Sequence, residues 1–254
     1  MNTHPMSLLQ LLSIIPILLI TLLAGAYPFI KKWRTQSGHD FPIGSSLAAG
    51  VFLGAGLIHM LGDASSDFSH LGYDYPFALF LAGVTFLVLL WLEHLGRELY
   101  EHQGESSAGF AVLALVMLSI HSFLAGTALG LSQSVSVLSV ILLAILAHKW
   151  AASFSLAIQI NKSRLTMSSG LLLFLVFACM TPLGILMGNG IEHHLQHIPL
   201  LEPIFSALAA GTFIYLGTLH GLNRAIMVRR CCNLKHFSFV IIGFAIMAVV
   251  ALWT

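Results

Sequence analysis

Two histidines and a lysine lie where polar side chains are costly. His121 and His148 each stand about halfway along a long apolar run, and Lys149 directly follows the second histidine. An unpaired polar group in such surroundings costs free energy that a leucine would avoid. The pair therefore favours a functional role over a role in packing.

The composition indicates the medium around these runs. Hydrophobic residues make up 57% of the chain and charged residues 8%, whereas a soluble domain has roughly 25% charged residues. Most of the surface must therefore face lipid. The basic residues are dispersed over short loops, which gives no support to a nucleic-acid partner. Because the sequence contains no HExxH motif and no evident nucleophile with a base, we expect neither an enzyme nor a resident cofactor.

Apolar runs of membrane-spanning length account for nearly the whole chain. A span must be helical, because backbone groups in lipid have no water to bind. The sequence therefore predicts an all-α integral membrane protein with eight transmembrane helices in a single transmembrane domain, residues 1–254. The first run is expected to be a retained span, since no basic leader segment precedes it. The predicted spans are about 7–30, 42–62, 76–96, 109–132, 136–160, 170–188, 201–222 and 237–253.

Basic residues predict which side of the membrane each loop occupies. All but one of the eleven Lys and Arg residues fall in the first, third, fifth and seventh loops, and the remaining one is Lys149. Cytoplasmic loops are enriched in Lys and Arg. We therefore predict cytoplasmic odd-numbered loops and extracytoplasmic termini. The short loops suit a bacterial inner (plasma) membrane.

With this topology, polar residues occur at three depths. His59 and Asp63 lie one turn apart near the outer end of the second span, so they share a helix face. His121 and His148 lie near the midplane, and His220 lies near the inner end of the seventh span. This series would line a permeation path, although Asp63 alone could be an ordinary interface anchor and His59 an ordinary core histidine. The expected outer rim, which would attract cations, comprises Asp67, Asp74, Glu192, His193, His194 and His197.

Six segments resemble, in order, motifs of the ZIP (ZRT/IRT-like) family of divalent metal transporters. They are GVFLGAGLIHMLGDA, YPFA with LEH, LSIHSFLAGTALGL, AHKWAASFSLAI, TPLGILMG and AGTFIYL, in spans two to seven. The resemblance implies eight helices and a mid-membrane metal site on spans four and five. Carried over residue by residue, it assigns to that site His121, Ser122, His148 and Lys149, and to its entrance His59 and Asp63. The small residues of AGTALG are also typical of a close helix-packing contact.

The chain departs from the family pattern at three positions. Ala125 and Ala152 stand where the resemblance implies glutamates on spans four and five, and His220 stands where it implies one on span seven. A divalent cation that leaves water needs compensating charge or strong ligands. Two imidazoles with a serine hydroxyl and water suit Zn²⁺, whereas Ca²⁺ and Mg²⁺ take oxygen ligands. We therefore expect a single weak site.

Three functions fit these residues. The first is transport of divalent transition-metal cations into the cytoplasm, with zinc as the first candidate and iron or other histidine-binding ions as alternatives. The second is a ZIP-like membrane protein that does not transport and acts as a sensor or partner subunit. The third is a carrier of a different solute, in which Lys149 recognises an anionic group. The expected partners are a divalent metal ion and the lipid bilayer, without nucleic acid, and a homodimer is left open.

Overall fold

Helices make up nearly all of the computed structural model, which describes residues 5–35, 41–101, 106–132, 134–163, 165–194, 199–218 and 234–253. In these ranges there is no β-strand. The helices are α1 (Pro5–Thr35), α2 (Pro42–Gly54), the π-helix η1 (Ala55–Met60), α3 (Leu61–His70), α4 (Phe77–Glu101), α5 (Ser106–Leu131), α6 (Val135–Lys162), α7 (Met167–His194), α8 (Leu201–Tyr215) and α9 (Leu234–Val250).

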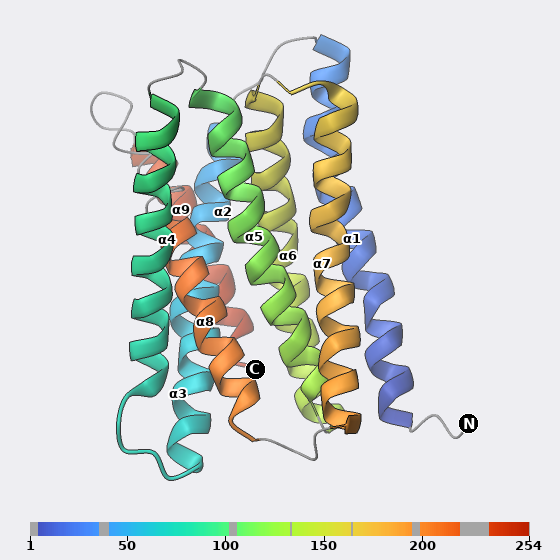
Figure 1. Ribbon diagram of the computed structural model, residues 1–254, viewed down its shortest axis with the longest axis vertical. Helices are drawn as coiled ribbons and strands as arrows, with labels where there is room; N and C mark the ends of the chain where they lie inside the picture. The colour runs from blue at the N-terminus through green and yellow to red at the C-terminus, as the bar shows by residue number, and fades with distance from the viewer. Residues whose placement is uncertain are drawn as a thin grey trace.

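Length and composition let most of these helices cross a membrane. Within the described ranges, seven segments are long and apolar enough to span it, with α2, η1 and α3 counted as one, whereas α9 has only 17 residues. Figure 1 shows the helices running in alternating directions, with the first turn of α1 and the last turn of α9 both toward the lower half of the bundle. The all-helical membrane architecture is as predicted. The count of eight spans and the side on which the termini lie stay predictions.

The second span is a continuous helix that changes its hydrogen-bonding pattern at the centre. It runs from Pro42 to His70, through the π-helix η1. The helix therefore continues eight residues past residue 62, the approximate end of the predicted second span. The reason is periodicity: Ala64 and Phe68 are buried one turn apart and pack with apolar residues of α4 and α8, so the segment is amphipathic although its composition is polar. The helix ends before Gly72, which has a φ of 83°.

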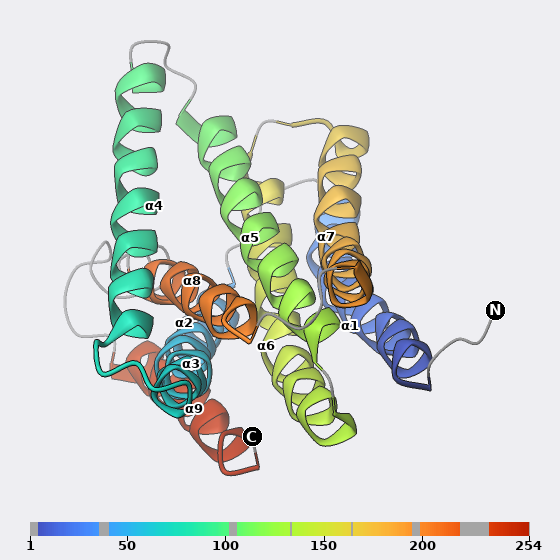
Figure 2. The ribbon, with the colours of Figure 1, turned by 60° about the horizontal axis from the view of Figure 1, so that its bottom comes forward.

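The helices form two groups. α1 packs on α6 and α7, and α5 packs on α6 and α7; in the second group, α2 packs on α9, and α8 packs on α3, α4 and η1. Figure 2 shows the first group on the right and the second on the left. The groups meet where α5 contacts α8 and where α2 contacts α6. Both histidines of the predicted metal site lie on the first group, at this boundary.

Glycines allow two of the helix pairs to approach closely. A Cβ atom on Gly126 of α5 would lie 2.3 Å from the Thr181 carbonyl oxygen of α7, and one on Gly184 of α7 would lie 2.2 Å from the Phe123 carbonyl oxygen of α5. A Cβ atom on Gly50 of α2 would likewise lie 2.0 Å from the Val240 carbonyl oxygen of α9. Small residues let helix backbones approach in lipid. The close contact predicted from AGTALG is confirmed, and it holds α5 and its histidine rigidly against α7.

Candidate metal site

His121 is buried on α5 and bonds to α8 through one ring nitrogen. Its Nδ1 atom lies 2.9 Å from the Thr212 Oγ1 atom and 3.3 Å from the Ala209 carbonyl oxygen. Its ring stacks on Phe213, with 3.5 Å between the ring centroids. The other ring nitrogen, Nε2, is buried and has no hydrogen-bond partner among the described residues. A buried imidazole nitrogen without a partner is available as a metal ligand.

His148 on α6 lies beside His121. The two ring centroids are 5.5 Å apart at an interplanar angle of 71°, and His148 also meets the ring of Phe213 edge-on at 4.7 Å. Its buried Nδ1 atom makes no hydrogen bond of standard geometry in the described part of the chain and has only a weaker contact with the Ala144 carbonyl oxygen, one turn earlier on α6. The structure therefore brings the two predicted histidines together, and each has an unused ring nitrogen.

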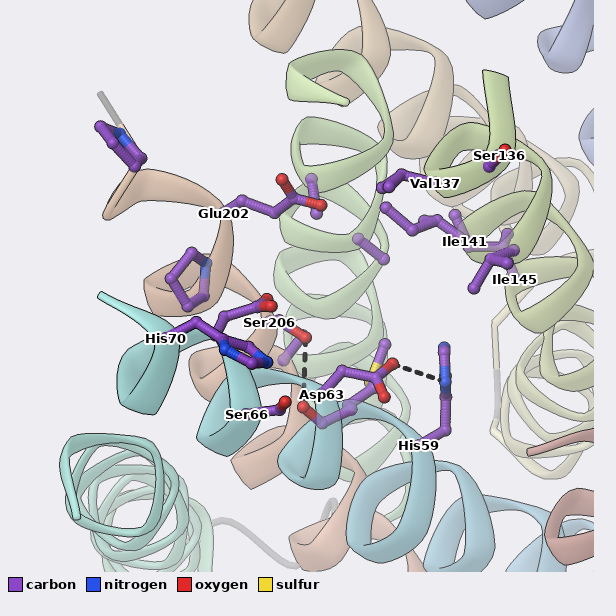
Figure 3. A pocket seen from close by; sticks show the side chains of 18 of the residues that line it. His59, Asp63, Ser66, His70, Ser136, Val137, Ile141, Ile145, Glu202 and Ser206 are labelled. Carbon is purple, nitrogen blue, oxygen red and sulfur yellow. Dashed lines mark hydrogen bonds and ion pairs between the residues drawn. The ribbon is translucent and has the colours of Figure 1, made fainter. Parts of the chain in front are cut away.

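A cavity of about 590 Å³ leads to His148 from one end of the bundle. Its walls come from the end of the second span and from α5, α6 and α8, so it lies at the boundary between the two helix groups. Figure 3 shows Asp63, His70, Glu202 and Ser206 on one side of it, with apolar α6 residues such as Ile141 opposite. Asp67 contributes a third carboxylate to the lining. Such a cavity has room for several water molecules, and its carboxylates favour a cation.

The predicted entrance pair also lines this cavity. The His59 Nδ1 atom on η1 lies 2.8 Å from the Asp63 Oδ2 atom on α3, an ion-pair contact that Figure 3 marks. The side chain of His59 is 6% exposed and that of Asp63 is 43% exposed. Asp63 therefore faces the cavity water, while His59 lies deeper. Both residues line the cavity, and π-helical turns such as η1 are frequent at functional sites.

Lys149 points elsewhere. Its Nζ atom donates to the Ser122 Oγ atom at 2.9 Å and to the Thr181 Oγ1 atom at 2.7 Å, and it lies 4.4 Å from the ring centroid of Phe177. Lys149 is 2% exposed and does not line the cavity. The predicted ligand Ser122 thus has the lysine as its partner. These contacts link α5, α6 and α7 around a buried amino group.

The remaining predicted residues are less informative. His220 and His197 lie outside the described residues, as do the side chains of Glu192, His193 and His194. Where the structure is described, no three His, Cys, Asp or Glu side chains lie close enough to hold one metal ion together. A metal ion bound by His121 and His148 would therefore need water molecules to complete its coordination shell.

Sequence reasoning overlooked three residues of the site. Glu202 lines the cavity from the first turn of α8. In the sequence it stands at the start of a predicted span, where a carboxylate is commonly an anchor at the membrane interface. Thr212 and Phe213 contact His121 from α8. Both belong to the AGTFIYL segment, and the resemblance of that segment to the family could have indicated that these two residues belong to the site.

Comparison with known proteins decides the family. The sequence model described as ZIP Zinc transporter matches residues 7–112 and 101–251 of this chain. The chain belongs to the ZIP zinc transporter family. Membership confirms the resemblance noted in the sequence, and it identifies a helical membrane protein of a metal-transporting family.

Individual ZIP proteins are similar along nearly the whole chain. Zinc transporter ZIP2 of Mus musculus is 28% identical over 300 residues, covering 94% of this chain and 96% of the relative. Zinc transporter ZIP1 of Danio rerio is 29% identical over 287 residues, covering 93% and 95%. Zinc transporter 11 of Arabidopsis thaliana is 26% identical over 273 residues, covering 93% and 82%. These relatives support divalent metal transport as the function.

Proposed function

We propose that this ZIP family member carries divalent transition-metal cations, with Zn²⁺ as the first candidate and iron as an alternative, across a membrane into the cytoplasm. The path begins in the cavity and passes between His148 and His121. The observation that carries this proposal is the cavity itself, which joins the carboxylates of Asp63, Asp67 and Glu202 to a buried imidazole. The relatives described as zinc transporters favour zinc.

The spacing of the imidazoles supports a shared metal ion. Zn–N bonds are about 2.0–2.1 Å long, so two imidazoles on one tetrahedral ion have ring centroids roughly 5 Å apart. The centroids of His121 and His148 are 5.5 Å apart. Small adjustments of the two rings would bring one nitrogen of each to a common ion, and water entering from the cavity would complete the shell. Such a site binds weakly, which suits an ion that must leave again.

Inward transport requires the cavity to open outside the cytoplasm. It opens where α3 ends and α8 begins, whereas Lys31, Lys162 and Lys235 stand at helix ends on the opposite side of the bundle. By the positive-inside rule, this distribution supports a cytoplasmic lysine-bearing side. We propose eight crossings with both termini extracytoplasmic. The expected bacterial inner membrane has no support from the relatives described above, which come from animals and a plant.

This orientation can be tested by labelling single cysteines. The tested positions, Ser69 and Lys235, are exposed near the two ends of the bundle. In a background in which the three native cysteines are replaced, Ser69→Cys should react with a membrane-impermeant maleimide from outside. Lys235→Cys should react only after the membrane is opened. The reverse pattern would place the cavity on the cytoplasmic side and contradict the proposed direction.

Transport can be tested with purified protein in proteoliposomes. His121→Ala and His148→Ala should each abolish zinc uptake, and the double substitution should do no further harm, because one imidazole cannot hold the ion alone. His94→Ala is the matched control, since His94 is exposed and bonds to the Leu90 carbonyl oxygen, away from the cavity. Uptake that is unchanged in both site variants would contradict the proposed path.

One observation favours a second function, a ZIP-like sensor or partner subunit that binds metal without transporting it. Alanines replace the glutamates that the family resemblance implies at positions 125 and 152, and the described residues contain no group of three metal ligands. A parent chain that binds zinc but takes up no divalent metal would select this function. Because Lys149 does not line the cavity, the carrier of an anionic solute is no longer favoured.

A further inference from the structure

We propose that Thr212 is a positioning residue, which holds His121 in the tautomer whose Nε2 atom carries the lone pair for the metal. This inference deepens the proposed function and rests on it. Thr212 lies on α8 and His121 on α5, so the contact joins the two helix groups. Thr212 itself would not touch the ion.

The available hydrogens decide the tautomer. The Ala209 carbonyl oxygen lies 3.3 Å from the His121 Nδ1 atom, and a carbonyl can only accept. The Thr212 hydroxyl donates its single hydrogen to that same carbonyl at 2.6 Å, so its oxygen can only accept from Nδ1 at 2.9 Å. Both neighbours therefore require a hydrogen on Nδ1. A neutral imidazole with its hydrogen on Nδ1 has its lone pair on Nε2, the buried atom without a described partner.

Close packing fixes Thr212 in place. A Cβ atom on the preceding residue, Gly211, would lie 2.4 Å from the Ala82 carbonyl oxygen of α4, so α8 and α4 are nearly in backbone contact there. On another side, a Cβ atom on Gly56 of η1 would lie 3.2 Å from the Ala210 carbonyl oxygen. Thr212 and the Ala209 carbonyl are thus held by helices on two sides. A hydrogen-bond acceptor on so rigid a segment can orient a metal ligand.

The consequence is a difference in metal affinity. A ligating histidine whose other ring nitrogen loses its partner typically binds metal 10- to 100-fold more weakly. Thr212→Val keeps the shape of the side chain and removes the acceptor. The Ala209 carbonyl would remain as a second, more distant acceptor, so we expect the lower end of this range, about a tenfold increase in the Kd for Zn²⁺. Thr212→Ser restores the acceptor and should restore the affinity.

The experiment measures the tautomer and the affinity separately. Protein with ¹⁵N-labelled imidazoles is studied by NMR in nanodiscs, and His121→Ala identifies the His121 signals among those of the 13 histidines. Without metal, the parent and Thr212→Ser should show a protonated Nδ1 and an unprotonated Nε2 at His121. Thr212→Val should show a mixture of the two tautomers. Isothermal titration with Zn²⁺ alone then gives the Kd of each variant.

The possible results separate the two proposals. A protonated Nε2 in the parent overturns the inference, and so does Thr212→Val with an unchanged tautomer and an unchanged Kd. If the tautomers behave as expected but no variant binds zinc, the metal-binding function fails while the positioning of His121 by Thr212 stands. A weakened Kd in Thr212→Val that Thr212→Ser does not restore also contradicts the inference, because a general packing defect would then explain it.

Discussion

Ala125→Glu should strengthen zinc binding at the proposed metal site. Ala125 lies one turn after His121 on α5 and lines the cavity, so a glutamate there would face the same space as His148. Residues four apart on a helix have Cβ atoms roughly 5–6 Å apart. A longer side chain on this face can therefore approach an ion held by the two imidazoles.

The size of the gain follows from two opposing terms. A carboxylate and a divalent ion about 6 Å apart attract each other by roughly 5–6 kcal/mol at an effective dielectric constant of about 20. Ionising the carboxyl at this depth costs about 3 kcal/mol. The net gain of roughly 2–3 kcal/mol corresponds to about a 30- to 150-fold lower Kd for Zn²⁺. The same free energy should appear as a metal-dependent rise in Tm, because the ion binds only the folded state.

The matched variant is Ala152→Glu. Ala152 is 1% exposed, packs in the apolar core and does not line the cavity. A glutamate there should lower the stability and leave zinc binding unimproved. Titration calorimetry and zinc-dependent melting of the parent and both variants would check this. If Ala125→Glu is folded, as judged by helical circular dichroism and a monodisperse elution, and its Kd is no lower than that of the parent, then His121 and His148 do not hold the ion.

Three further predictions test the entrance, the buried lysine and the packing. Asp63→Asn should raise the apparent KM for zinc uptake roughly 3- to 10-fold with little change in maximal rate, because a partly exposed carboxylate attracts cations through water. The difference in KM should shrink in high salt. A loss of maximal rate at unchanged KM would contradict this prediction. Lys149→Met should tighten zinc binding roughly fivefold, or by about 1 kcal/mol, since it removes a buried amino group whose protonated form repels a nearby cation. Weaker zinc binding in calorimetry would instead show that the amino group supports the site. Gly126→Ala should lower the free energy of unfolding by about 1–3 kcal/mol through overpacking, since its Cβ atom would lie 2.3 Å from the Thr181 carbonyl oxygen. Gly83→Ala, which has open space around it, should leave the melting temperature unchanged or slightly higher. Equal melting temperatures of the two variants would rule out the close contact.

The sequence by itself was sufficient for the class of the protein. Hydropathy and the cost of unpaired backbone groups in lipid require apolar runs to be helices, whatever their neighbours are. The six matched segments, in their order along spans two to seven, were also sufficient for the family resemblance, because spaced residue types are a local property of the chain. The helical end of the second span could have been predicted as well, since Ala64 and Phe68 recur at helical spacing, but composition outweighed periodicity in that prediction.

Only the tertiary structure decided how these residues meet. In the sequence Ala125 and Ala152 are equivalent, each one turn after a histidine, and both are buried in the apolar core, yet only Ala125 also lines the cavity. Lys149 adjoins His148 in the chain, but its ammonium group bonds to Ser122 and Thr181 on other helices. The Nδ1 atom of His121 contacts the hydroxyl group of Thr212, 91 positions away in the chain. Such contacts depend on which helices pack together and on the rotation and depth of that packing, which hydropathy and motif spacing do not specify.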